Sequence, residues 1–61
     1  MPIVRVEMLT GRSPEQKAQL AEAITRAMID IAKAKPEDTN IVFQDVERGD
    51  WAVAGRLMSK R

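Results

Sequence analysis

The 61-residue sequence contains no cysteine and no histidine. Without cysteine there are no disulfides and no thiolate metal site. Without histidine, a zinc or iron site would depend on carboxylates alone, a ligand set that these metals rarely use in proteins. We therefore expect no metal site, and the only group that can titrate near neutral pH is a terminal amine.

Aromatic residues and net charge are also scarce. One Phe and one Trp are too few for a base-stacking platform, and a net charge of +1 gives no field that attracts nucleic acid or an anionic membrane. The sequence has no signal peptide and no apolar run long enough to span a bilayer. We expect no nucleic-acid partner, no membrane partner and a cytoplasmic location.

The short length predicts one domain, residues 1–61, that depends on association. A chain of this size buries only about 60% of its unfolded surface. Small scaffolds usually need disulfides, a metal or oligomerisation to persist. Because the first two are excluded, the sequence predicts an oligomer.

Two segments have the pattern of β-strands. In residues 3–9, Val4, Val6 and Met8 alternate with a more mixed set of side chains, so that one face of the strand is apolar. Residues 40–46 contain the run Ile-Val-Phe, which is apolar enough for a strand buried on both faces. The turn after the first strand contains Gly11, which is free to take a positive φ.

A long helix is predicted between these strands. Ser13 suits the N-cap, Pro14 suits the first helical position, and Gln16 can close a capping box with Ser13. The helix is expected to run from Pro14 to Ala32 or Lys33, and Pro36 stops any continuation. Apolar residues at three- and four-residue steps predict its core stripe, which comprises Leu20, Ile24, Ala27, Met28 and Ile31.

These elements predict an α/β (α+β) fold built on a single β-α-β unit with parallel strands. Residues 51–55 are expected to form a short C-terminal β-hairpin, followed by a basic tail, residues 56–61, that is mobile near its end. One helix cannot cover both faces of a two-stranded sheet. The uncovered face is expected to meet another subunit; it carries Ile3, Arg5, Glu7 and Leu9.

Pro2 is the most informative single residue. If Met1 is removed, Pro2 becomes the amino terminus and carries a secondary amine on a rigid ring. A terminal α-amine has a reference pKa of about 7.7–8.0, and burial beside apolar groups or near a cation lowers it. Such an amine can act as a general base. The alternative is that proline stands second for no chemical reason, as in many proteins.

Three features of the sequence occur together: Met1-Pro2 before a strand, Leu-Thr-Gly-Arg-Ser-Pro-Glu-Gln-Lys at 9–17, and Gly-Asp-Trp-Ala-Val-Ala-Gly at 49–55. In this combination the chain resembles the 4-oxalocrotonate tautomerase (2-hydroxymuconate tautomerase) family over nearly its whole length. The resemblance implies a tautomerase-like fold completed by oligomerisation. Family members of this length are typically hexamers, built as trimers of dimers, with sites formed across subunits.

The resemblance also implies roles for individual residues. Pro2 matches the catalytic general base, which shuttles a proton between an enol oxygen and carbon. Arg12 matches the arginine that holds a substrate carboxylate, and Trp51 matches an aromatic position that keeps the surroundings of the proline apolar. Leu9 is counted with them as a substrate-binding position. The implied function is a cofactor-independent keto–enol tautomerase, an isomerase acting on a small carboxylate such as 2-hydroxymuconate or phenylenolpyruvate, of the kind used in aromatic degradation.

Asn40 departs from the family pattern, because the family's best-studied members have a second substrate-binding arginine at this position. Asn40 can donate hydrogen bonds but brings no charge, and a neutral donor contributes about half the energy of a charge-assisted one. Efficient turnover of a dicarboxylate is therefore in doubt. A monocarboxylate enol such as phenylenolpyruvate needs only one carboxylate clamp. Asn40 has the simpler alternative role of starting the second strand.

Other functions remain open from the sequence. If Met1 is retained, the nitrogen of Pro2 is an amide, and the chain is a non-catalytic oligomeric module for binding or assembly, with Trp51 as an interface anchor. A dehalogenase or decarboxylase of the same superfamily would use a protonated terminal proline as an acid. For that chemistry, the sequence offers no clear water-activating carboxylate close to Pro2.

Overall fold

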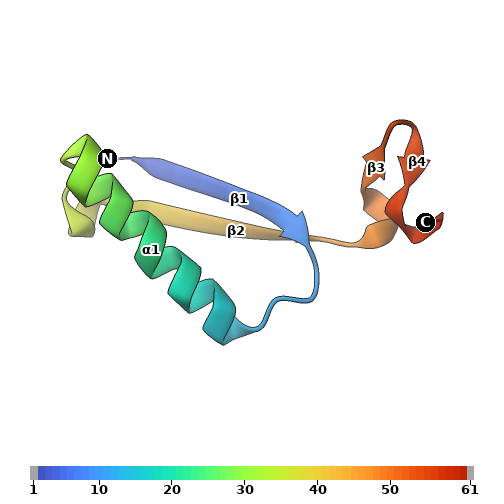
Figure 1. The fold of residues 1–61 in the computed structure, drawn as a ribbon, viewed down its shortest axis with the longest axis horizontal. Coiled ribbons are helices and arrows are strands. Elements are labelled where there is room, and N and C mark those ends of the chain that lie inside the picture. The colour runs from blue at the N-terminus through green and yellow to red at the C-terminus, as the bar shows by residue number, and fades with distance from the viewer. Residues whose placement is uncertain (1, 61) are drawn as a thin grey trace.

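The fold is a βαβ unit followed by a β-hairpin (Figure 1). The computed structural model describes residues 2–60. Its regular elements are β1 (Ile3–Leu9), α1 (Pro14–Ala32), β2 (Asn40–Val46), β3 (Ala52–Val53) and β4 (Arg56–Leu57), with 3₁₀ turns at Pro36–Asp38, Arg48–Asp50 and Met58–Lys60. β1 and β2 pair in parallel over their full length, and β3 pairs with β4 in antiparallel fashion. The predicted fold class is confirmed.

Helix α1 begins and ends where the sequence predicts. The backbone N–H of Gln16 donates to Ser13 Oγ at 3.2 Å, and the backbone N–H of Ser13 donates to Gln16 Oε1 at 2.9 Å, which completes the capping box. The helix ends at Ala32 and is capped by Lys33, whose φ of 60° is in the left-handed region. Within residues 2–60, no helix has the length and apolar character needed to cross a membrane.

The two faces of the β1–β2 sheet differ in how much of their surface is exposed. On β1, Val4, Val6 and Met8 are half-buried, and their β2 partners Ile41 and Phe43 are half-buried too. Helix α1 lies along this side of the strands (Figure 1). Residues of the opposite face are more exposed, with Ile3 at 61% and Val42 at 42%. The predicted uncovered face is therefore present in the single chain.

The predicted core stripe of the helix is right for only part of its length. Ile24 and Met28 are half-buried. Leu20, Ala27 and Ile31 are exposed, with Ile31 at 81% and Leu20 at 37%. A sheet of two strands is too narrow to cover the whole apolar side of a 19-residue helix, so one flank of that side projects beyond it.

The C-terminal hairpin is longer than predicted. Strand β4 takes Arg56–Leu57 from the segment expected to be a basic tail, and Met58–Lys60 adds a 3₁₀ turn. The turn between β3 and β4 is formed by Ala54 and Gly55, whose φ angles are both positive, at 53° and 80°. This is the backbone geometry of a tight two-residue hairpin turn. The predicted mobility near residue 61 lies outside the described residues.

The hairpin projects away from the βαβ unit and gives the chain an open shape (Figure 1). The radius of gyration is 14.4 Å, against about 10–11 Å for a compact chain of this length. The accessible surface is 4790 Å², against roughly 4,000 Å² for a folded monomer of this mass. No side chain among residues 2–60 is fully buried. A single chain therefore lacks the core that a stable small domain requires.

Candidate active site

Pro2 and Asn40 lie next to each other where the two long strands begin. The backbone N–H of Asn40 donates to the carbonyl oxygen of Pro2 at 3.0 Å. Pro2 is half-buried, and Asn40 is the first residue of β2, opposite Ile3. The side-chain amide of Asn40 donates to the carbonyl oxygen of Asp38 at 3.3 Å. The predicted base position therefore has a neutral hydrogen-bond donor beside it.

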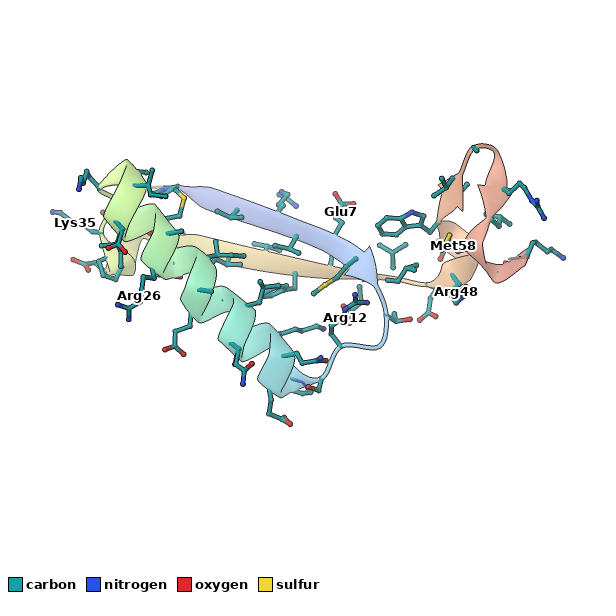
Figure 2. All side chains as sticks on the ribbon, viewed as in Figure 1. Glu7, Arg12, Arg26, Lys35, Arg48 and Met58 are labelled. Atoms are coloured by element: carbon teal, nitrogen blue, oxygen red, sulfur yellow. The ribbon has the colours of Figure 1, made fainter. Side chains whose placement is uncertain are left out.

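Leu9 and Arg12 lie together at the other end of β1. Leu9 is the last residue of that strand, and its carbonyl oxygen accepts a long hydrogen bond of 3.4 Å from Nη1 of Arg12. The Arg12 side chain is exposed, in the loop between β1 and α1 (Figure 2). Gly11, with φ of 125°, permits the sharp turn that precedes it. Most of the guanidinium's donors remain available for a planar carboxylate.

Trp51 belongs to the C-terminal hairpin segment and not to the βαβ core. It follows the Arg48–Asp50 turn, and its carbonyl oxygen accepts a 2.7 Å hydrogen bond from the backbone N–H of Met58. A second bond, from Nη2 of Arg48 to the carbonyl oxygen of Met58 at 3.0 Å, ties the turn to the end of the hairpin. Trp51 is half-buried within this small unit. Its position is held by the fold of the hairpin itself.

The predicted site residues thus form two groups that the single chain keeps apart. Pro2 and Asn40 lie at the start of the strands, whereas Leu9 and Arg12 lie at the end of β1 (Figures 1 and 2). Seven residues of a parallel strand, the length of β1, rise by about 20 Å. A proton acceptor at Pro2 and the guanidinium of Arg12 within one chain cannot contact the same small substrate.

An ion pair that the sequence pattern does not predict lies beside the Arg12 loop. Nζ of Lys17 lies 2.7 Å from Oδ2 of Asp45, at the end of β2. Asp45 shares the helix-facing side of β2 with Ile41 and Phe43, so a carboxylate stands where the alternation calls for an apolar residue. This charged residue within the apolar alternation of β2 is the feature of the sequence that could have indicated the ion pair. Elsewhere in the described part of the chain, no three acidic side chains gather as a metal site would require.

The fold and these two residue groups define a small α+β protein with a βαβ unit and a projecting hairpin arm. A family profile described as "Tautomerase enzyme" matches residues 2–61. The chain belongs to the tautomerase family. This family membership confirms the resemblance on which the residue roles rest.

Curated relatives agree with this membership over nearly the whole chain. A probable tautomerase of Halalkalibacterium halodurans is 41% identical over 59 residues, which cover 97% of each chain. The 2-hydroxymuconate tautomerase of Comamonas testosteroni is 36% identical over 55 residues, which cover 90% of this chain and 87% of that relative.

Solved structures show the same fold. The structure of YwhB, a homologue of 4-oxalocrotonate tautomerase, superimposes with a TM-score of 0.95 at 35% identity and covers 98% of both chains. A heterohexamer 4-oxalocrotonate tautomerase from Chloroflexus aurantiacus superimposes with a TM-score of 0.92 at 35% identity, covering 98% of this chain and 97% of that one. The structural neighbours thus include an oligomeric tautomerase.

Proposed function

We propose that this protein is a cofactor-independent keto–enol tautomerase, with Pro2 as the general base once Met1 has been removed. The observation that carries the proposal is the half-buried Pro2 at the start of β1, in a chain of the tautomerase family. A keto–enol shift needs a group that takes a proton from oxygen and returns it to carbon. A free secondary amine on a rigid ring meets this need.

Arg12 is the proposed carboxylate-binding residue. Among residues 2–60, its exposed guanidinium makes one hydrogen bond, of 3.4 Å, to the carbonyl oxygen of Leu9. Its planar fork matches two carboxylate oxygens at once. Held near the reacting carbon, its positive charge stabilises the developing enolate. Leu9 and Trp51 are proposed to supply apolar surface beside the substrate.

We further propose that each site is completed between subunits of a homo-oligomer. Within one chain, Pro2 and Arg12 stand at opposite ends of β1, about 20 Å apart by strand rise. The exposed sheet face around Ile3 and Val42 and the exposed helix flank around Ile31 provide apolar surface for association. A hexamer assembled as a trimer of dimers is the proposed form, in which Pro2 of one subunit meets Arg12 of another.

The proposed substrate class is an enol with one carboxylate next to the reacting centre. Asn40, which lies beside Pro2, offers a neutral amide that already donates to the carbonyl oxygen of Asp38. A second carboxylate would therefore gain no ion pair at this end. We propose that phenylenolpyruvate, a monocarboxylate, is turned over more efficiently than the dicarboxylate 2-hydroxymuconate.

Ketonisation rates of both substrates test the assignment. Pro2→Ala keeps a terminal amine but loses the rigid ring, so kcat is expected to fall about tenfold or more. Arg12→Ala is expected to raise KM about tenfold, because a charge-assisted bidentate contact is lost, and also to lower kcat, because the charge that stabilises the developing enolate is lost. Arg26→Met, at an exposed position of α1, serves as the control and keeps native rates. Native rates in both site variants would contradict the roles assigned to Pro2 and Arg12.

Mixed oligomers test the sharing of the site between subunits. Pro2→Ala and Arg12→Ala subunits are unfolded together at equal amounts and refolded, so that the two types mix within one oligomer. If each site takes Pro2 from one subunit and Arg12 from another, about a quarter of the sites regain both groups and activity returns. Each variant refolded alone is the control. Failure of the mixture to exceed the two controls would show that the site is not shared.

A further inference from the structure

The loop that carries Arg12 is tied at both ends to consecutive residues of β2. At its start, the backbone N–H of Thr10 donates to the carbonyl oxygen of Val46 at 3.1 Å. Just beyond its end, Nζ of Lys17 donates to Oδ2 of Asp45 at 2.7 Å. Within residues 2–60 the Lys17–Asp45 contact is the only ion pair, and it joins residues 28 positions apart.

Lys17 is connected to the Arg12 loop through the first hydrogen bond of the helix. The backbone N–H of Lys17 donates to the carbonyl oxygen of Ser13 at 3.1 Å, and Ser13 follows Arg12 directly. The capping box between Ser13 and Gln16 makes this first turn stiff. The first turn of α1 therefore links the residue next to Arg12 to the residue whose side chain bonds to β2.

We propose that the Lys17–Asp45 pair positions the Arg12 guanidinium for carboxylate binding. The proposal rests on the function proposed above for Arg12. The contacts of Thr10 and Lys17 with β2 lie on either side of Arg12 in the sequence. They therefore fix the loop relative to the sheet as well as to the helix. Lys17 and Asp45 are positioning residues, because they act on the substrate through Arg12.

The expected effect is modest, because the pair is partly exposed. The side chains of Lys17 and Asp45 are 27% and 41% accessible, and ion pairs with such exposure contribute at most about 1 kcal/mol, or about fivefold in a binding constant. Arg12 holds the carboxylate in both the ground state and the transition state. Its displacement therefore raises KM more than it lowers kcat.

Kinetics with the monocarboxylate enol provide the first test. Lys17→Met and Asp45→Asn remove one charge each while keeping side-chain size, and each is expected to raise KM about fivefold. The double variant with Lys17→Asp and Asp45→Lys restores the ion pair in reverse and is expected to recover part of that loss. Arg26→Met is the control, because it also removes one positive charge, at an exposed position farther along α1 (Figure 2). KM values that stay native in Lys17→Met and Asp45→Asn would overturn the proposal.

Whether the effect of Lys17→Met on KM requires Arg12 distinguishes a positioning role of Lys17 from a purely structural one. In an Arg12→Ala background, Lys17→Met is expected to cause no further rise in KM, because the group being positioned is gone. A fivefold rise that persists in this background would show that Lys17 acts through something other than Arg12.

A measurement that does not depend on catalysis tests the positioning role separately from the proposed function. The ¹H–¹⁵N heteronuclear NOE of the amides at residues 11–13 reports the order of the Arg12 loop directly. It is expected to fall in Lys17→Met and Asp45→Asn and to stay native in Arg26→Met. Unchanged NOE values would overturn the positioning role. A native protein with ordered loop amides but no ketonisation of either enol would instead overturn the proposed function.

Discussion

The backbone N–H of Asn40 donates a hydrogen bond to the carbonyl oxygen of Pro2, with an N–O distance of 3.0 Å. This bond extends the β1–β2 ladder by one step and fixes the backbone of the proposed base against the first residue of β2. Substitution at position 40 therefore changes the chemistry beside Pro2 without altering the backbone that holds it.

Asn40→Arg is expected to favour the dicarboxylate. A guanidinium at this position can form a charge-assisted bond with a second carboxylate, which is worth about 1 kcal/mol more than a neutral bond. We expect kcat/KM for 2-hydroxymuconate to rise about fivefold and that for phenylenolpyruvate to change less. Asn40→Gln, which keeps a neutral amide, is the control. Equal gains for both substrates would show that position 40 is remote from the second carboxylate.

The pH profile of the rate is expected to follow a single basic group. The amine of Pro2 accepts a proton only when it is unprotonated, so kcat/KM rises with pH and levels off above the pKa of that amine. The reference value for a terminal amine is about 7.7–8.0, and partial burial favours the neutral form. A profile measured from pH 5 to 9 checks this. A rate that increases toward acid pH would indicate a protonated proline acting as an acid.

Ile3→Lys is expected to weaken the assembly. Ile3 is 61% exposed in the single chain, and burial of such a side chain in an interface contributes about 1.5–3 kcal/mol. A lysine there should raise the subunit dissociation constant at least about tenfold and lower activity in parallel. Sedimentation velocity over a range of protein concentrations measures the change. Gln19→Lys, on an exposed part of α1, is the control, and an equal loss of assembly in both variants would contradict the role of Ile3.

Lys33→Gly is expected to stabilise the protein. Lys33 has φ of 60°, a left-handed conformation that costs a non-glycine residue about 1 kcal/mol. Glycine removes this strain, so the free energy of unfolding should rise by about that amount. Urea denaturation at one fixed protein concentration measures it. Lys33→Ala removes the charge but keeps the Cβ, so a gain of equal size in that variant would show that the backbone is not the cause.

Local chemistry explains why so much of the fold could be predicted from the sequence. The capping residues Ser13 and Gln16 and the left-handed stop after Ala32 act over a few positions, so α1 begins and ends as expected. The alternation in residues 3–9 similarly determines both the strand and its covered face. The hairpin was harder to delimit, because its fourth strand depends on a turn formed by Ala54 and Gly55 with positive φ at both residues.

Features that depend on pairing between distant segments could not be predicted. The Lys17–Asp45 pair requires the strand register and the position of α1 over the sheet. Ile31 was predicted to be buried because helical periodicity identifies an apolar side but not how much of it a narrow sheet covers. The separation of Pro2 from Arg12 is different, because it follows from the length of the extended strand that the sequence predicts between them.

The fate of the first residue decides the central claim, because Pro2 has a basic nitrogen only as the terminal residue. The most direct measurement compares kcat/KM for phenylenolpyruvate between two forms of the protein. One form has lost Met1, as shown by its intact mass, and the other carries an additional lysine between Met1 and Pro2 that prevents the removal. We predict that the extended form keeps the same oligomeric state and loses at least about 100-fold in kcat/KM. Equal rates in the two forms would contradict the account.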